Sequence, residues 1–245
     1  MAWDAAVVAD RIESDLRALG TPERAESEKR YLKSELTFLG ATVWQIRDVA
    51  KAVSDAEALN HDRLVALVET LWATRIFDRR MAAAMLLELY PGLLTRSDMP
   101  LLERLLRESL TWALVDGLAA NVVGGLNRAD PAMEPILDRW AADPDFWIRR
   151  ASLLAELMPL KYGAPLPPFL RRADAMLEEK EFFIRKAIGW VLREVGKKRP
   201  AEVVDWLAPR TGRASGVTMR EAVRYLPEAD GERLMAAYRE KRPAS

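Results

Sequence analysis

Asp116 is a carboxylate within the otherwise apolar stretch LTWALVDGLAANVVGGL, residues 110–126. Burying an isolated ionised carboxylate is costly, so such a residue is paired, solvated in a cleft, or placed there for chemistry. Trp112 precedes Asp116 by four residues, which puts both side chains on one face of a helix. Together with Arg150 and Trp190 further along the chain, this pair could form a small aromatic cleft beside a phosphate-binding group.

A repeat in the sequence predicts the elements that carry these residues. Similar segments begin at an aromatic residue, run apolar at three-to-four spacing, and start 35, 35 and 36 residues apart, at Phe77, Trp112, Trp147 and Phe183. A fifth copy starts 36 residues later, near Met219. A second helical pattern lies between successive copies, with Asp98 and Asp130 expected as caps. Helix pairs at this period are typical of an α-solenoid of HEAT-like repeats.

The repeat predicts an all-α fold and a single domain over residues 1–245. No stretch alternates apolar and polar residues over strand length, and no linker rich in Gly, Ser or Pro divides the chain. Equivalent positions of successive repeats gather on the concave side of a solenoid. We therefore expect Arg150 and Trp190 on that face.

Asp116 departs from the pattern of the other repeats. Three copies carry a basic pair after the aromatic residue, whereas the Trp112 copy has Leu114 and Val115 there, followed by the acid. In this alignment Asp116 stands opposite Met81, Ala151 and Ala187. One interpretation is structural: Asp116 pairs with an arginine of the next helix or binds backbone near Gly117. The other is that the acid serves chemistry.

The charge is unevenly distributed along the chain. The 37 basic and 37 acidic residues balance, which by itself argues against a nucleic-acid partner. Residues 149–199, however, hold 12 Lys or Arg residues against 6 Asp or Glu, while residues 1–148 hold 17 against 24. This asymmetry is typical of a protein with one anion-facing surface. Basic and acidic helix faces that simply alternate in solvent remain the alternative.

Composition excludes several other classes of protein. The chain has no Cys, and its lone His61 is better explained as a helix-start residue than as a metal ligand, so we expect no metal site. The first residues include Asp4 and Asp10 and lack a basic leader, and no apolar run reaches membrane-spanning length. We expect a monomeric cytoplasmic protein without a membrane partner.

The chain resembles the DNA alkylation repair glycosylases of the AlkD type, which have a bacterial HEAT-like fold. The resemblance rests on ERAESEKRYLKSELTFLGATVWQIRDVAK, WALVD, FWIRRASLL and EFFIRKAIGWVLREV, in this order and spacing, and reaches from about residue 20 to TMREAV. The family's active-site set maps to Trp112, Asp116, Arg150 and Trp190. Tyr31 matches a cleft position. Thr42 stands where the family carries a cleft Gln, Val43 and Trp44 replace its neighbours, and Thr111 replaces a common second Trp.

The resemblance implies hydrolysis of the N-glycosidic bond of alkylated purines such as 3-methyladenine or 7-methylguanine in double-stranded DNA, without metal or organic cofactor. Asp116 would stabilise the cationic sugar, Trp112 and Trp190 would wall it, and Arg150 would hold a backbone phosphate. Further DNA contacts on the concave, DNA-binding face would come from Tyr31, Thr42, Arg149, Arg185, Lys186, Lys197, Lys198 and Arg199. For each basic residue, solvated surface charge is the alternative, and for the whole chain the alternative is a non-catalytic HEAT-repeat scaffold that binds DNA or protein.

Overall fold

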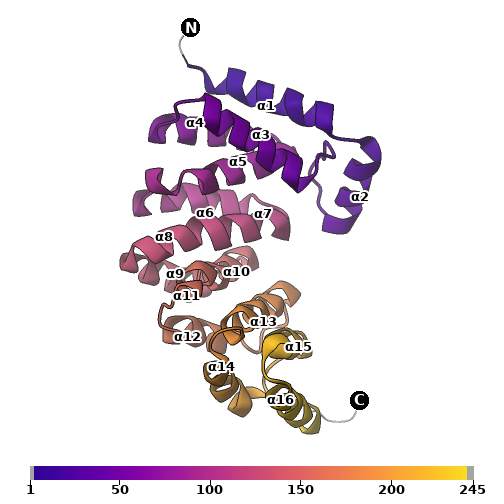
Figure 1. Cartoon of the computed structure of the whole chain (residues 1–245), viewed down its shortest axis with the longest axis vertical. Helices are drawn as coiled ribbons and strands as arrows, with labels where there is room; N and C mark the ends of the chain where they lie inside the picture. The colour runs from indigo at the N-terminus through magenta and orange to yellow at the C-terminus, as the bar shows by residue number, and fades with distance from the viewer. Residues whose placement is uncertain (1–2, 242–245) are drawn as a thin grey trace. The chain divides into compact units, whose positions relative to one another are not determined.

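Helices make up the regular structure of residues 3–241, which are the residues that this computed structural model describes (Figure 1). Within these residues the only β-type pairing is an isolated parallel bridge between Thr37 and Ile76. The prediction of an all-α fold is therefore confirmed. The helices are α1 Ala5–Leu19, α2 Pro22–Leu32, α3 Val43–Ala56, α4 His61–Trp72, α5 Phe77–Leu89, α6 Met99–Arg107, α7 Trp112–Gly117, α8 Gly124–Ala129, α9 Glu134–Ala141, α10 Phe146–Leu154, α11 Leu157–Lys161, α12 Pro167–Ala175, α13 Phe182–Gly196, α14 Pro200–Leu207, α15 Gly216–Ala222 and α16 Glu228–Glu240.

The chain forms two compact units, Met1–Leu126 and Asn127–Ser245. In each unit, helices pack against their neighbours in the chain and against the next helices but one. The single domain over residues 1–245 stays a prediction. No helix within residues 3–241 is long and apolar enough to cross a membrane.

The first unit is built around α5. α1 packs on α3 and α4, and both of these pack on α5. The side chains of Trp72 and Phe77 are fully buried in this core, and burial of a large apolar side chain contributes about 1.5–3 kcal/mol. Every residue from Phe77 to Leu87 is buried, so α5 lies inside the unit instead of presenting a polar face to water.

A loop fastened to α5 sets the position of α3. Asp78, which is fully buried at the start of α5, accepts hydrogen bonds from the backbone N–H groups of Leu39 (2.8 Å) and Ala41 (3.1 Å). Gly40 between them has a φ of +87°, and a Cβ there would lie 2.2 Å from the carbonyl oxygen of Thr21. Only glycine fits this turn, which brings the start of α2 against the start of α3.

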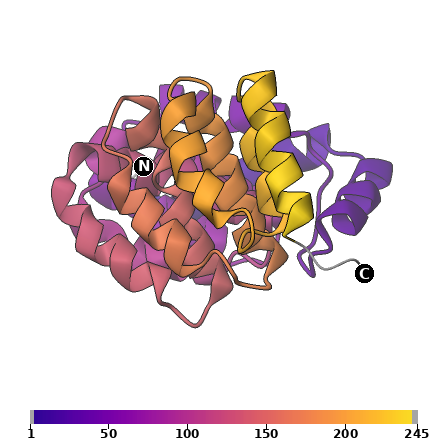
Figure 2. The same cartoon turned by 90° about the horizontal axis from the view of Figure 1, so that it is seen from below.

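The second unit is built around α13. α13 packs on α10, α14 and α15. α16 packs on both α14 and α15, so α16 lies beside each of these two helices (Figure 2). A Cβ on Gly189 would lie 2.6 Å from the Cβ of Glu221, so the glycine allows α13 and α15 to approach closely. The Thr218 hydroxyl also donates to the Arg185 carbonyl at 3.0 Å. The starts of these two helices are thus fixed to each other.

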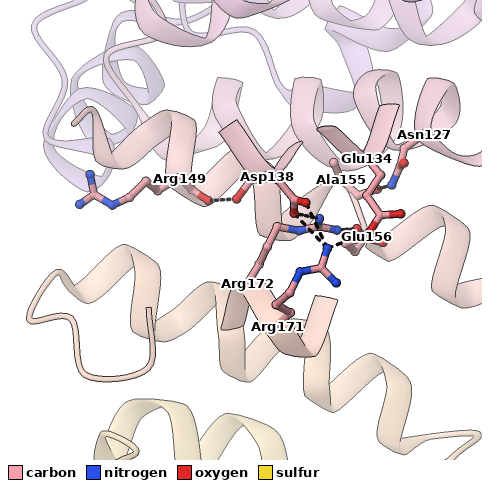
Figure 3. Close-up of polar contacts among 9 residues, drawn as sticks. Asn127, Glu134, Asp138, Arg149, Ala155, Glu156, Arg171 and Arg172 are labelled. Carbon is pink, nitrogen blue, oxygen red and sulfur yellow. Dashed lines mark hydrogen bonds and ion pairs between the residues drawn. The ribbon is translucent and has the colours of Figure 1, made fainter. Parts of the chain in front are cut away.

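A buried ion-pair cluster joins α9, α12 and the segment after α10 in the second unit (Figure 3). Arg172 is 3% exposed and pairs with Glu156, which is 5% exposed. Its other terminal nitrogen donates to Asp138 at 2.6 Å. The neighbouring Arg171 reaches the same Asp138 and the more exposed Glu134. Five charged side chains therefore hold three helical segments together.

Side-chain caps determine where the repeat helices begin. α5 and α7 begin at Phe77 and Trp112, as the repeat predicts. In the later copies, a capping side chain accepts a hydrogen bond from the first turn and starts the helix earlier than the aromatic pattern suggests. The caps are Thr111 before α7, Asp145 before α10, Glu181 before α13 and Ser215 before α15. α10 and α13 thus begin one residue early, and α15 begins three residues before Met219.

Two other features differ from the sequence expectation. Asp98 does not cap α6 with its side chain; it accepts from the Thr95 backbone N–H (2.8 Å) and contacts His61 Nε2 (2.7 Å). The predicted regular helix after Trp112 widens into a π-helix over Leu118–Val123 before α8 begins. A π-helical turn inside a helix is rare and frequently lies at a functional site. Here it directly follows the turn that carries Asp116.

Candidate active site

Asp116 and Trp112 occupy the same short helix in the first unit. Thr111 caps α7, so the helix begins at Trp112 and reaches Asp116 one turn later. Both side chains are half-buried. The four-residue spacing places them on one face, as the sequence predicts.

The helix caps correct the repeat alignment around Asp116. Counted from each capped start, Asp116 is the fifth residue of α7, and the fifth residues of α10, α13 and α15 are Arg150, Lys186 and Arg220. The alignment that set Asp116 opposite Ala151 and Ala187 was wrong, because Asp145 and Glu181 start their helices one residue earlier. The acid thus occupies a position that is cationic in the helices that follow.

Tyr31 and Trp112 meet at a cavity in the first unit. Their rings are in edge-to-face contact, with centroids 5.8 Å apart and planes at 83°. This geometry is favourable for aromatic pairs. The cavity, of about 310 Å³, lies beside α7 and includes Gly117, the residue after Asp116. Its other lining residues are mainly apolar and come from α2, α3, α5, α7 and the π-helix: Glu28, Leu32, Val43, Arg47, Phe77, Met81, Ala84, Met85, Glu88, Ala113 and Asn121.

Two carboxylates of this cavity were missed by the sequence analysis. Glu28 accepts from Arg24 at 2.7 Å through one oxygen, while its other oxygen is buried without a partner within residues 3–241. Burial raises the pKa of the Glu28 carboxyl, against the opposing effect of Arg24. Glu88 pairs with Arg47 at 3.3 Å. The spacing of Glu28 and Tyr31, three residues apart on α2, is the signal that could have placed this acid on the cavity face.

Thr42 has a structural role in the fold. Its hydroxyl accepts from the Gln45 backbone N–H at 3.2 Å, and the Gln45 side chain accepts from the Thr42 backbone N–H at 2.7 Å. This reciprocal capping box starts α3. A contact of Thr42 with DNA stays a prediction.

Arg150 and Trp190 belong to the second unit. Arg150 is 3% exposed on α10; one terminal nitrogen donates to the Phe183 carbonyl, and its guanidinium lies 5.7 Å from the centre of the Phe183 ring. Trp190 is half-buried on α13, and Phe183 is the second residue of the same helix. The structure therefore fixes Arg150 against the first turn of the helix that carries Trp190.

The first arginine of each basic pair in this unit fastens its own helix to the preceding loop. Arg149 donates to the Asp143 carbonyl (2.7 Å) and Arg185 to the Glu179 carbonyl (2.6 Å), each six residues back. Arg149 also makes two parallel bonds to Glu179, both 2.9 Å, and is therefore fully engaged in structural contacts. Arg80 makes the same contact with Thr74 at 2.8 Å in the first unit.

The remaining predicted DNA contacts are held locally to different degrees. Lys186 pairs with Glu221 at 2.7 Å, and Lys197 pairs with Glu194 at 2.6 Å. Lys198 donates to the Lys161 carbonyl, and Arg199 donates to the Ala164 carbonyl. An exposed pair such as Lys197 and Glu194 contributes little stability. Their contacts with phosphate stay predictions.

Comparison with known proteins identifies relatives with the same fold. A family model described as DNA alkylation repair enzyme matches residues 12–226. No curated protein sequence matches the chain. A solved structure of a predicted DNA alkylation repair enzyme from Enterococcus faecalis is 22% identical with a TM-score of 0.77, covering 85% of this chain and 97% of that one.

Two solved structures from Streptococcus mutans are also similar. AlkD2 is 15% identical with a TM-score of 0.65, covering 91% of this chain and 99% of that one. The protein smu.31 from strain UA159 is 16% identical with a TM-score of 0.59, covering 86% of this chain and 100% of that one. At these identities the structures support the fold alone.

The fold and the site define the class: an all-α helical-repeat protein with an acid and an indole one turn apart, next to an aromatic-lined cavity. The family match spans residues 12–226 of the 245-residue chain. The chain belongs to the DNA alkylation repair enzyme family.

Proposed function

We propose that this protein is a DNA glycosylase that hydrolyses the N-glycosidic bond of cationic alkylated purines, such as 3-methyladenine and 7-methylguanine, and leaves an abasic site. The observation that carries the proposal is the placement of Asp116 one turn after Trp112, beside the cavity that Tyr31 and Trp112 share. The family to which the chain belongs supports DNA as the substrate.

The residue types suit the chemistry of this reaction. An N-alkylated purine carries a positive charge, so the bond between the sugar C1′ and the base nitrogen breaks with its electron pair leaving on a base that becomes neutral. Positive charge then develops on the deoxyribose, as in glycoside hydrolysis. The Asp116 carboxylate would stabilise this charge and orient a water, whose oxygen bonds to C1′ while its proton passes to the carboxylate and on to solvent. The π face of Trp112 would favour the same cation.

The other predicted residues act on the DNA backbone and the sugar in this proposal. Arg150 would bind a backbone phosphate, and Trp190 would pack against the sugar. The phosphate contact of Arg150 would fix the position of the protein along the DNA without sequence preference. No lysine accompanies Asp116 on α7, so the proposal contains no Schiff-base step and the product is the intact abasic strand.

Asp116→Asn tests the proposal because it keeps the shape of the side chain and removes its charge. We expect release of 7-methylguanine from methylated duplex DNA to fall at least about 100-fold, while the melting temperature and DNA affinity stay close to those of the wild type. Asp48→Asn, a change of the same type at an exposed position of α3 outside the cavity, serves as the matched control and should keep the wild-type rate.

The structural interpretation of Asp116 predicts the opposite pattern. Breaking a buried ion pair costs about 3–5 kcal/mol, so Asp116→Asn would be clearly destabilised while excising 7-methylguanine at the wild-type rate. That result would refute the catalytic role. A wild-type protein that binds duplex DNA but releases no alkylated base would instead indicate a non-catalytic scaffold.

A further inference from the structure

A second cavity lies at the start of α15, within the second unit. It has a volume of about 420 Å³ and is lined by three arginines: Arg185 from α13, Arg213 from the loop before α15, and Arg220 from α15 itself. Glu178 is the only acidic residue among its lining residues. The cavity therefore has a surplus of positive charge.

One of the three arginines is already neutralised. Arg213 pairs with Glu178 at 2.6 Å and with Asp174 at 3.0 Å. Hydrogen bonds to Glu178 and Asp174 raise the pKa of the Arg213 guanidinium. Arg213 thus completes a local charge balance, and the positive surplus belongs to the other two.

Arg185 presents an oriented guanidinium to the cavity. Its Nε donates to the Glu179 carbonyl at 2.6 Å, which fixes the plane of the group. Its two terminal nitrogens have no hydrogen-bond partner within residues 3–241. This arrangement leaves a pair of donors with the fork geometry that matches phosphate oxygens.

Arg220 supplies the second unpaired charge. Across the part of the chain that the structure describes, it makes no hydrogen bond or ion pair. One of its terminal nitrogens lies 3.0 Å from the point where a Cβ of Gly216 would stand, so the glycine gives the side chain room against the helix. Arg220 is also the fifth residue of α15, the position that Arg150 occupies in α10.

The packing of α13 on α15 fixes the backbone positions of the two arginines relative to each other. The Thr218 hydroxyl, two residues before Arg220, donates to the carbonyl of Arg185 at 3.0 Å. The close approach at Gly189 fixes the same two helices further along. Two unpaired guanidinium groups at one cavity, carried by helices that are packed closely together, are suited to an oxyanion with several acceptor oxygens.

We infer that Arg185 and Arg220 form a binding site for a phosphodiester of the DNA backbone. The inference rests on the proposed function, since it takes DNA as the ligand. Arg185 is among the DNA contacts predicted from the sequence, whereas Arg220 is a new one. It would anchor the DNA without reading its sequence.

The salt dependence of DNA binding tests this site. Each phosphate contact adds about 0.9 to the steepness with which the logarithm of the DNA association constant falls with the logarithm of the salt concentration. Losing one contact therefore makes the fall in affinity between about 50 and 200 mM salt roughly 3.5-fold smaller. We expect that change for Arg220→Gln and about a twelvefold smaller decline for the double variant with Arg185→Gln. Arg220→Lys should keep the wild-type slope. Binding is measured by fluorescence anisotropy with a short undamaged duplex.

Arg233→Gln is the matched control, because Arg233 is 57% exposed on α16, pairs with Asp230, and loses the same charge. An unchanged slope in Arg220→Gln, or an equal change in Arg233→Gln, would overturn the inference, as would a wild-type protein that does not bind the duplex. Calorimetric titration with inorganic phosphate separates the sources of the ligand: phosphate binding lost in Arg220→Gln with an unchanged DNA slope would assign the site to free phosphate and overturn the DNA contact.

The excision assay separates this inference from the proposed function. Wild-type protein that releases 7-methylguanine, with an unchanged slope in Arg220→Gln, refutes the phosphate site alone. Wild-type protein that releases no base, with the expected change of slope, refutes the glycosylase proposal and supports the phosphate site.

Discussion

Replacing Asp78 by alanine removes the acceptor that fastens the loop before α3 to α5. The backbone N–H groups of Leu39 and Ala41 then lose their partner, and each buried donor left unsatisfied costs about 1–3 kcal/mol, so the two together cost about 2–6 kcal/mol. Burial raises the pKa of the Asp78 carboxyl, which means that burying the ionised side chain destabilises the folded state. Alanine removes this destabilisation, which offsets part of the loss. We therefore expect the lower part of the range, about 2–4 kcal/mol.

Thermal unfolding followed by circular dichroism measures this effect. For a chain of this size each kcal/mol corresponds to about 2–4 °C, so the melting temperature should fall by about 4–16 °C. Asp48→Ala, which removes an exposed acid from α3, is the matched control and should change the melting temperature little. A fall in Asp78→Ala no larger than that of the control would refute the reasoning.

The pH dependence gives a second test of the same residue. A carboxyl whose folded-state pKa is raised contributes stability that is complete below its ordinary value of 3.8 and is lost as the pH rises through the folded-state pKa. Asp78→Ala lacks this contribution. The gap in melting temperature between the wild type and the variant should therefore narrow as the pH rises through that range, and a gap that widens would contradict the assigned direction.

Two further predictions concern charged pairs elsewhere in the fold. Hydrogen bonds that the protonated His61 ring donates, first to Asp98 and then to Asp62, raise its pKa above 6.5; the stability that they contribute, less than about 1 kcal/mol for a ring that is 44% exposed, is complete below pH 6.5 and is lost as the pH rises through the folded-state pKa. His61→Gln should flatten this pH dependence in urea titrations, and an unchanged dependence would contradict the assignment. Glu156→Gln should lower the free energy of unfolding by about 3 kcal/mol, because the buried Arg172 then keeps only Asp138 as a partner. Glu134→Gln, at the exposed edge of the same cluster, should lower it by less than about 1 kcal/mol, and equal effects of the two variants would contradict the role of burial.

The helices could be predicted from the sequence because their pattern is local. The apolar spacing and the aromatic residues identify where α5 and α7 begin, at Phe77 and Trp112. The starts of α10 and α13 were one residue off because a capping acid competes with the aromatic signal. Both caps, Asp145 and Glu181, are visible in the sequence, so counting from the cap would have given the correct register.

Contacts between distant residues could not be predicted from periodicity. Tyr31 and Trp112 lie far apart in the chain, and only the family resemblance suggested that both line a cleft; the structure places their rings in contact. Conversely, Arg149 and Arg220 look alike in a charge count. One is bound by Glu179 and two carbonyls, whereas the other makes no hydrogen bond or ion pair within residues 3–241. The difference depends on which helices pack together, which no charge pattern contains.

The π-helix after Asp116 affects how sequences of relatives must be aligned with this chain. A π-helical turn takes up more residues than an α-helical turn, so the helix that begins at Trp112 holds extra chain before α8 begins at Gly124. A relative with a regular α-helix there aligns only if a gap is opened in the middle of the helix. An ungapped alignment that is anchored on α9 would shift the residues upstream and place a neighbour of Asp116 opposite a relative's acid. The two halves of this helix must therefore be anchored separately, one at the Thr111 cap and the other at the Asp130 cap.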